Sequence, residues 1–439
     1  MRTIILVLAL AMPSLATARQ AATAAMTGQW IVTLDRWGNP EYSVLNLREN
    51  DRTLSGDWDG DPVKGTVGER AIMVSTTDGQ GGVYEFRAKR AADTLSGVAD
   101  FPDNNNPSQR LQYRFTARRV PARASNAAQV HDFLPADYAN SFSAERPPVL
   151  TIWPGDTVRT STIDSGGVDA KGQTRALFGN PQTGPFFVAG AAQGDTLVVH
   201  IRKLRLNRDW ADSLDSIVGR ALGSRLVADG TDLGKPVRWR LDRSTGMASP
   251  ELAAGRLKDY KVPVRPMLGG LGLASGFGAP AMSTGDTGRA GGNMDFPEVI
   301  EGNTVYLPVQ QPGALLYLGD GHALQGDGET SQYGLETSLD VEFTVDLIKS
   351  QTVPMPRVES PTELMVLGQA GSLDEALKAA STGLISWLRQ DYGLTLSETA
   401  QVMGTAVRFS VPNLAGRSVG VAARIDKALL PQPLKALGN

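Results

Sequence analysis

The segment Gly194-Asp195-Thr196-Leu197-Val198-Val199-His200-Ile201 combines a turn with the start of a β-strand. The Gly-Asp pair favours a tight turn, and the threonine and branched residues that follow favour a pleated strand. The same entry recurs as Gly155-Asp156-Thr157-Val158 and as Gly302-Asn303-Thr304-Val305. Further apolar runs occupy Val149–Ile152, Val305–Val309 and Ala314–Tyr317. From near His131 onward, these repeated strands predict a jelly-roll-like β-sandwich.

A different strand pattern occupies the region before residue 122. Trp30, Val32 and Leu34 alternate with other residues, as expected for a strand that buries one face. The pattern Thr-Leu-Ser-Gly occurs at 53–56 and again at 94–97, each time after a turn that contains aspartate. Alternation of this kind, with turns about every eight to twelve residues, predicts a small antiparallel β-barrel that is similar in layout to a lipocalin.

The last part of the chain changes to helical spacing. Ser372 and Glu375 form a capping-box pattern, and apolar residues follow at intervals of three or four. Thr395 and Glu398 form a second such pattern. Helices are therefore predicted within about residues 371–405, where they serve as scaffold. The whole chain is predicted to be mainly β, in an α+β arrangement.

The N-terminus matches a secretory signal. Met1-Arg2 supplies the charge, Ile4–Met12 the apolar run, and Ala16-Thr17-Ala18 the small residues before a cleavage site. We expect cleavage after Ala18 and a periplasmic or secreted mature protein. No later run reaches the roughly 18 consecutive apolar residues of a membrane helix, so no transmembrane segment is expected.

Composition narrows the range of partners. The 439 residues contain no cysteine, so a large core rather than disulfides must stabilise the exported chain. The 43 basic and 46 acidic residues nearly balance, which gives no electrostatic case for nucleic acid. We therefore expect a small, neutral partner. The predicted organisation is a signal peptide (1–18), a linker (19–26), the barrel (27–121), a second linker (122–130) and the sandwich domain (131–439).

The segment Gly319-Asp320-Gly321-His322-Ala323-Leu324-Gln325-Gly326-Asp327-Gly328-Glu329 holds three carboxylates and one of the three histidines between glycines. Side chains two apart on a strand share a face, so Asp320 can lie beside His322, and Asp327 beside Glu329. Glycines let a substrate or water approach the backbone closely. This composition is typical of a metal-dependent hydrolytic site. The alternative is structural, because Gly-Asp pairs form turns and acidic loops are commonly only solvated.

Seven motifs follow one another along the chain: Trp153–Val158, Thr162–Asp164, Asn180–Pro185, Gly190–Asp195, Gly291–Asp295, Tyr306–Val309, and Gly319–Glu329 with Glu336 beyond it. Taken together, they resemble the acetamidase/formamidase family of linear-amide hydrolases. The resemblance runs from about Pro147 to the C-terminal helices and leaves the barrel outside. It implies cleavage of an amide C–N bond with release of ammonia or an amine, and a homo-oligomer.

One segment departs from the family pattern. Tyr138–Ala144 stands where compared members carry an aromatic-rich, histidine-containing entry just before the first strand. An entry at that place is positioned to shape the substrate pocket. This departure, the expected export and the added barrel favour a substrate other than simple acetamide or formamide.

The sequence excludes several amidase mechanisms. Without cysteine a Cys-Glu-Lys site is impossible, and the chain has neither a Ser-Ser-Lys segment nor a Gly-x-Ser-x-Gly elbow. Water activated by a metal ion or a carboxylate remains. One histidine with several carboxylates fits Zn²⁺, which is the expected metal, whereas an all-oxygen subset would fit Ca²⁺.

We assign roles to individual residues from their side-chain type and from their position in the family motifs. The predicted metal ligands are His322, Asp164 and Asp295, with Asp320 as a further ligand or as a residue that orients His322. The predicted catalytic residues are Glu329 as general base, Asn293 as oxyanion donor and Asp327 as a supporting carboxylate.

Structural alternatives stand beside several of these roles. Asp164 can serve only to turn the chain, and Asn293 can be a left-handed turn residue. His131 and His200 are interpreted as structural histidines. The glycine-rich stretch Met267–Gly292 has the wrong spacing for a nucleotide loop, and is interpreted as a mobile or closely packed wall of the pocket.

A rival function is a periplasmic binding protein that keeps the sandwich and a structural divalent-metal site without turnover. The combination of His322 with several carboxylates favours the enzyme, since a binding protein needs no general base. Ammonia release from short amides, measured before and after chelation, separates the two functions.

Overall fold

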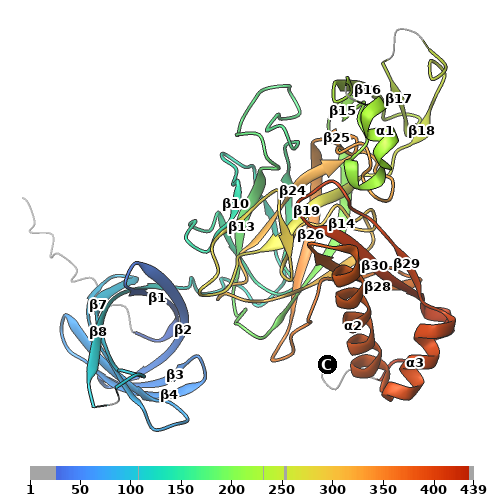
Figure 1. The fold of residues 1–439 in the computed structure, drawn as a ribbon. Coiled ribbons are helices and arrows are strands. Elements are labelled where there is room, and N and C mark those ends of the chain that lie inside the picture. Colours follow the sequence, from blue (N-terminus) through green and yellow to red (C-terminus); the bar gives the residue numbers. More distant parts are fainter. Residues whose placement is uncertain (1–25, 107, 231, 252–254, 435–439) are drawn as a thin grey trace, which may run out of the picture.

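The computed structural model describes residues 26–106, 108–230, 232–251 and 255–434. The predicted signal peptide and residues 19–25 of the predicted linker lie outside the described residues. Figure 1 shows a barrel at one end, β-sheets in the middle and the C-terminal helices beside them. The chain is mainly β, as predicted. Among the described residues, no helix combines the length and the apolar character needed to cross a bilayer.

The N-terminal barrel is antiparallel and closed, because β1 also pairs with β8. Its strands are β1 (Gly28–Arg36), β2 (Asn39–Asn50), β3 (Thr53–Trp58), β4 (Asp61–Val67), β5 (Ala71–Thr77), β6 (Val83–Ala91), β7 (Thr94–Pro102) and β8 (Arg110–Arg119). Trp30, Val32 and Leu34 are buried in its apolar core, which confirms the predicted alternation. Met26, which the sequence assigned to the linker, is buried in the same core.

The repeated Thr-Leu-Ser-Gly pattern has a steric cause. A Cβ at Gly56 would lie 1.9 Å from the carbonyl oxygen of Asn46 on the neighbouring strand. A Cβ at Gly97 would lie 2.0 Å from the carbonyl oxygen of Arg87. Glycine is therefore required at both positions, because the backbone of the neighbouring strand leaves no room for a side chain.

The second domain is built from two large sheets whose facing side chains form one apolar core. The first runs in the order β29 (Arg408–Ser410), β30 (Val419–Asp426), β28 (Glu363–Ala370), β27 (Arg357–Glu359), β23 (Thr304–Pro308), β14 (Thr196–Leu206), β26 (Leu339–Ile348), β12 (Thr157–Ser161), β9 (Val130–Asp132). The second runs in the order β18 (Val262–Pro263), β17 (Met247–Pro250), β16 (Pro236–Asp242), β15 (Trp210–Leu214), β25 (Glu336–Thr337), β24 (Leu316–His322), β19 (Met267–Leu273), β22 (Gly291–Asn293), β21 (Thr287–Gly288). In addition, β13 (Gln182–Val188) pairs with β24, and β11 (Leu150–Ile152) pairs with β13. The shared core includes Val158, Leu197 and Phe343 from the first sheet and Phe186, Leu268 and Leu318 from the second.

Strand β24 places the predicted site residues. Up to Gly319 it pairs with β13, and from Gly321 onward it pairs with β25. Its other edge pairs with β19. Asp320 therefore lies where one partner replaces the other, and its backbone is left-handed, with φ 54°. This change of partner opens the edge of the sheet at Asp320.

The two predicted helices are present. Helix α2 (Leu373–Tyr392) begins where the Ser372 side chain accepts the N–H of Glu375, and α3 (Leu396–Thr405) begins with a full capping box between Thr395 and Glu398. The apolar face of α2 packs against β28 and β30. The remaining elements are short: β10 (Ser141–Phe142), β20 (Met282–Ser283), α1 (Ser224–Asp229), η1 (Gly219–Ala221) and η2 (Lys427–Leu429).

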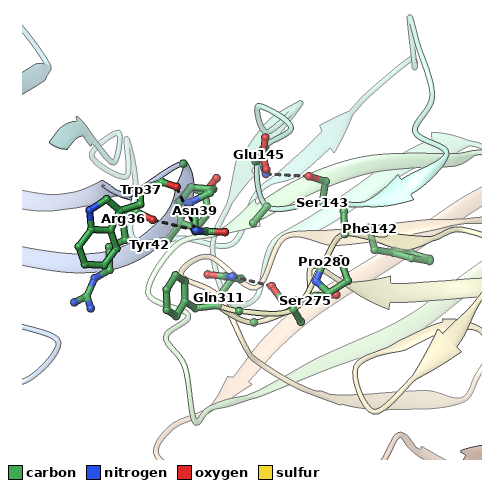
Figure 2. A pocket seen from close by; sticks show the side chains of 18 residues that line it. Arg36, Trp37, Asn39, Tyr42, Phe142, Ser143, Glu145, Ser275, Pro280 and Gln311 are labelled. Carbon is green, nitrogen blue, oxygen red and sulfur yellow. Dashed lines mark hydrogen bonds between the residues drawn. The ribbon is translucent and has the colours of Figure 1, made fainter. Parts of the chain in front are cut away.

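The barrel meets the sandwich around a cavity of 620 Å³. Figure 2 shows the barrel residues Trp37 and Asn39 on one side and the sandwich residues Ser275 and Gln311 on the other. Ile31 of the barrel also packs on a small apolar cluster that includes Phe187 and Leu315 of the sandwich. This barrel-side cavity has none of the predicted site residues in its lining.

Candidate active site

The structure brings five buried side chains together, which we call the acidic cluster. They form two groups that share His322: Asp295 with Glu329, and Asp320 with Glu336. Within each group, one possible ligand atom of each residue lies within 4.8 Å of the others. Asp320 and His322 come from the end of β24, Glu336 from β25, Glu329 from the loop between them, and Asp295 from the turn after β22.

Glycines let these side chains crowd together. A Cβ on Gly269, in β19, would lie 2.6 Å from Oδ2 of Asp320 and 2.7 Å from Oδ1 of Asp295. A Cβ on Gly334 would lie 2.5 Å from Nδ1 of His322. Any side chain at either position would therefore occupy the space of the cluster.

Three members of the cluster have strained backbones. The φ angles of Asp295, Asp320 and Glu329 are 44°, 54° and 44°, all in the left-handed region. Such a conformation costs a non-glycine residue about 1–3 kcal/mol and persists only where the surroundings impose it. Three such residues in one buried group indicate that the fold is arranged to aim these carboxylates inward.

Gln325 fixes the tautomer of His322. The side-chain nitrogen of Gln325 donates to the carbonyl oxygens of Asp295, at 2.6 Å, and of Pro412, at 3.1 Å. Its oxygen therefore faces Nδ1 of His322, at 2.8 Å, and accepts a hydrogen bond from it. With the proton held on Nδ1, Nε2 offers its lone pair to the cluster, as in metal-binding histidines.

Four buried atoms of the cluster lack a hydrogen-bond partner among the described residues. They are Oδ1 of Asp295, Oδ1 of Asp320, Nε2 of His322 and Oε2 of Glu336. Nε2 lies 3.2 Å from Oε1 of Glu336 and 3.6 Å from Oδ1 of Asp320. Buried polar atoms without partners are rare and costly, and here they converge. One nitrogen and several carboxylate oxygens are a donor set that suits a divalent cation.

The pKa values of the cluster residues also favour a bound cation. Burial, together with the charge of Asp320, raises the pKa of Asp295 to about 8. Burial also raises the pKa of Glu329 and of Glu336. Although burial alone would lower the pKa of His322, the charges of Glu336 and Asp320 raise it well above its usual value. Without a cation the buried carboxylates must therefore take up protons. A bound cation would stabilise their charged forms instead.

Three asparagines hold the outer oxygens of the aspartates. Asn180 donates to Oδ2 of Asp320 at 3.0 Å and to the side-chain oxygen of Asn293 at 2.6 Å. Asn293 in turn donates to Oδ2 of Asp295 at 2.6 Å, and Asn413 donates to the same oxygen. The inner oxygens, Oδ1, are thereby left facing the cluster.

The structure assembles most of the predicted site residues but not all of them. His322, Asp295, Asp320 and Glu329 lie in the acidic cluster, and Asn293 contacts it. Asp164 lies outside both ligand groups, because its carboxylate pairs with Arg208 at 2.8 Å and accepts the N–H of Val168 at 2.8 Å. Asp327 is exposed on the loop surface. The ion pair with Arg208 thus competes with the metal-ligand role predicted for Asp164. Asp327 faces solvent instead of the cluster.

Sequence reasoning gave no role to three residues that shape the site. Glu336 stood in the family motifs, and its proximity to Gly334 repeats the glycine-acid pairing of the preceding segment. Gln325, three residues after His322, had no distinguishing signal. Arg208 comes from a distant segment, so no local pattern could pair it with Asp164.

A cavity of 450 Å³, which we call the Glu336 cavity, adjoins the cluster. Its lining includes Glu336, Asp164 and Ser165, and the aromatic residues Phe178, Trp210 and Tyr333. Tyr333 lies close enough to the cluster to be affected by its charge, because burial and the charge of Glu336 raise the pKa of Tyr333. The cavity therefore meets the cluster at Glu336.

Comparison with known proteins agrees with this geometry. Residues 249–364, which contain the whole acidic cluster, match the model of the Acetamidase/Formamidase family. A predicted formamidase of Schizosaccharomyces pombe is 52% identical over 61 residues, a match that spans 14% of this chain and 15% of that protein.

Solved structures match over a much longer span. A predicted acetamidase/formamidase from the thermophile Thermoanaerobacter tengcongensis is 26% identical, with a TM-score of 0.59 over 69% of this chain and 97% of that one. An acetamidase from Yersinia enterocolitica is 27% identical, with a TM-score of 0.61 over 70% and 95% of the two chains. The domain that follows the N-terminal barrel is thus similar to the acetamidase/formamidase family of amide hydrolases, in sequence over residues 249–364 and in fold over most of its length.

Proposed function

We propose that this chain hydrolyses the C–N bond of a linear amide at the acidic cluster, with a divalent metal ion bound there. One observation supports the metal above all others. Asp295, Asp320, His322 and Glu336 each have a buried, unpartnered ligand atom, and they belong to two ligand groups that share His322. A purely structural cluster would be expected to satisfy these atoms with protein hydrogen bonds.

The donor set favours zinc. His322 supplies the nitrogen, and the carboxylates of the cluster supply oxygens, a combination that Zn²⁺ accepts readily. Calcium prefers six to eight oxygen ligands, so the histidine argues against it, although the carboxylates alone would suit it. A divalent ion held here would lower the pKa of a bound water from 15.7 toward about 7.

Glu329 is the group that we assign to proton transfer. It is buried, it belongs to the ligand group of Asp295 and His322, and burial raises its pKa. A carboxylate with a raised pKa can accept a proton from water and return it to the leaving nitrogen near neutral pH. Asn293 keeps its proposed role as an oxyanion donor, through the N–H that it does not give to Asp295.

The cavity argues against a non-catalytic binding protein. A structural metal site gains nothing from access, yet Glu336 belongs both to the cluster and to the lining of the Glu336 cavity. A small molecule in the cavity would therefore stand beside Glu336, at the edge of the cluster. This arrangement favours turnover over a sealed structural ion.

We place the mature protein in the periplasm or outside the cell, and we expect a homo-oligomer. The location rests on the charged, apolar and small-residue pattern of residues 1–18. N-terminal sequencing of the protein recovered from its native compartment tests it. The expectation of an oligomer rests on the family, and sedimentation equilibrium tests it.

Ammonia release from a panel of primary amides tests the activity directly. We expect the purified chain to release ammonia, to lose this activity on chelation and to regain it when Zn²⁺ is added. Glu329→Gln should lose activity and keep its metal, because the amide cannot take the proton. His200→Ala is the matched control for His322→Ala, since His200 lies on β14 and pairs with Asp346 at 3.3 Å. Activity that persists in His322→Ala would overturn the assignment.

A further inference from the structure

The Glu336 cavity is much larger than the smallest amides. Its 450 Å³ correspond to about 15 water molecules at their liquid volume of about 30 Å³ each. Acetamide has four non-hydrogen atoms and formamide has three. A substrate of that size would leave most of the cavity to water. The volume therefore suits an amide that carries a larger group.

Aromatic side chains line the cavity. Phe178 is 67% exposed, an unusual position for a phenylalanine, and it stands at the cavity wall with Trp210 and Tyr333. Ligand pockets are lined mainly by apolar and aromatic side chains, and these three rings stand together at one cavity. Aromatic rings prefer other rings as partners, in stacked or edge-to-face geometry.

Trp210 is held rigidly in this wall. The guanidinium of Arg208 lies 3.4 Å from the centre of its ring, and that of Arg238 lies 4.0 Å from it. Arg208 is itself fixed by its buried ion pair with Asp164. Because the two guanidinium groups cover the two faces of the ring, Trp210 offers a ligand its edge, in a position that needs no ordering when the ligand binds.

The charges around the cavity are paired with one another. Asp164 is matched by Arg208 at 2.8 Å, and Asp212 by Arg238 at 2.7 Å. Apart from Glu336 of the acidic cluster, the charged residues that line the cavity all take part in these pairs. A charged group on the substrate would have to break a pair or stay unpartnered, so the cavity suits an uncharged group.

We propose that the Glu336 cavity holds an uncharged aromatic ring attached to the amide, so that aryl amides are better substrates than acetamide or formamide. This inference rests on the proposed amidase function of the acidic cluster. The ring would stand against Phe178 and Trp210 while the amide reaches Glu336 and its neighbours. The geometry is compatible with a ring on the acyl side of the C–N bond or on the nitrogen side.

Four substrates test the proposal in the purified full chain: acetamide, benzamide, acetanilide and 4-carbamoylbenzoate. Burying a ring of phenylalanine size is worth about a tenfold to hundredfold gain in binding. We expect kcat/KM for benzamide or acetanilide to exceed that for acetamide by about this factor. Which of the two aryl amides is preferred shows the side on which the ring lies. The carboxylate of 4-carbamoylbenzoate should cancel most of the gain of benzamide.

Variants separate ring binding from catalysis. Phe178→Ala should lower kcat/KM for the preferred aryl amide about tenfold more than for acetamide, and Phe178→Tyr should restore the preference. Phe277→Ala is the control, because Phe277 is 50% exposed and lines the barrel-side cavity. Equal rates for acetamide and the aryl amides, or an unchanged preference in Phe178→Ala, would overturn the inference and leave the amidase function standing. No turnover of any of the four would refute the amidase function itself.

Discussion

Replacing Arg208 by methionine should destabilise the second domain strongly. Arg208 is buried and pairs with Asp164 at 2.8 Å. It also donates to the carbonyl oxygens of Trp210 and Glu336 and to Oγ1 of Thr337, each at 3.0 Å. Methionine fills much of the same volume, but it leaves the carboxylate of Asp164 buried without a counter-charge.

The expected size of the effect follows from these contacts. Removing one partner of a buried ion pair costs about 3–5 kcal/mol. A domain of about 300 residues unfolds with an entropy of about 0.6 kcal/mol per kelvin, so Tm should fall by about 5–8 °C. Asp164→Asn in the same chain removes the unpaired charge. The double variant should therefore recover about 0.5–3 kcal/mol relative to Arg208→Met alone.

Differential scanning calorimetry of the mature chain measures the change. Arg205→Met is the matched control, because Arg205 lies near the end of β14, three residues before Arg208, and its side chain is 58% exposed in an ion pair with Glu301. An exposed pair contributes less than about 1 kcal/mol, which corresponds to less than about 2 °C. The reasoning is refuted if Arg208→Met shifts Tm no more than the control, or if adding Asp164→Asn lowers Tm further.

Three further predictions concern the acidic cluster. Gln325→Leu removes the acceptor for Nδ1 of His322, so Zn²⁺ affinity should fall about 10–100-fold in a chelator competition; unchanged affinity would contradict the assigned tautomer. Gly269→Ala puts a methyl group 2.6 Å from Asp320 and should reduce metal content, whereas Gly276→Ala, with no contact closer than 3.5 Å, should retain it; equal metal contents would refute the crowding. In the metal-free protein, burial raises the pKa of Asp295 from 3.8 to about 8. The native state then holds a proton that the unfolded state has released, so stability should fall as pH rises from about 4 to 8. Asp295→Asn should flatten this dependence in calorimetry, and a Tm that rises over the same window in the unmodified protein would contradict the shift.

Much of the fold could be predicted because its signals are local. Alternating Trp30, Val32 and Leu34 specify a strand of the barrel whatever surrounds them. The caps at Ser372 and Thr395 satisfy backbone groups within one turn, so each helix start is encoded in four residues. Glycines before Thr196 and Thr304 likewise mark the strand starts directly.

The site was predictable where it is contiguous or where a family motif marks it. Asp320, His322 and Glu329 share one segment, and Asp295 follows from the family motif. Asp164 and Arg208, in contrast, meet through the pairing of distant strands, so the ion pair that occupies Asp164 has no sign in the local sequence. The same holds for Asn180 and Asn413, which orient the aspartates from distant segments. Contacts of this kind depend on the folded sheet and not on spacing.

The metal content of the purified chain tests the central claim most directly. Elemental analysis of protein prepared without chelator should find stoichiometric divalent metal, expected to be zinc, in the unmodified chain and in His200→Ala. His322→Ala should lose most of it, because the cluster loses its nitrogen ligand. Metal-free unmodified protein whose Tm does not rise when Zn²⁺ or Ca²⁺ is added, or a His322→Ala variant with undiminished metal, would contradict the account.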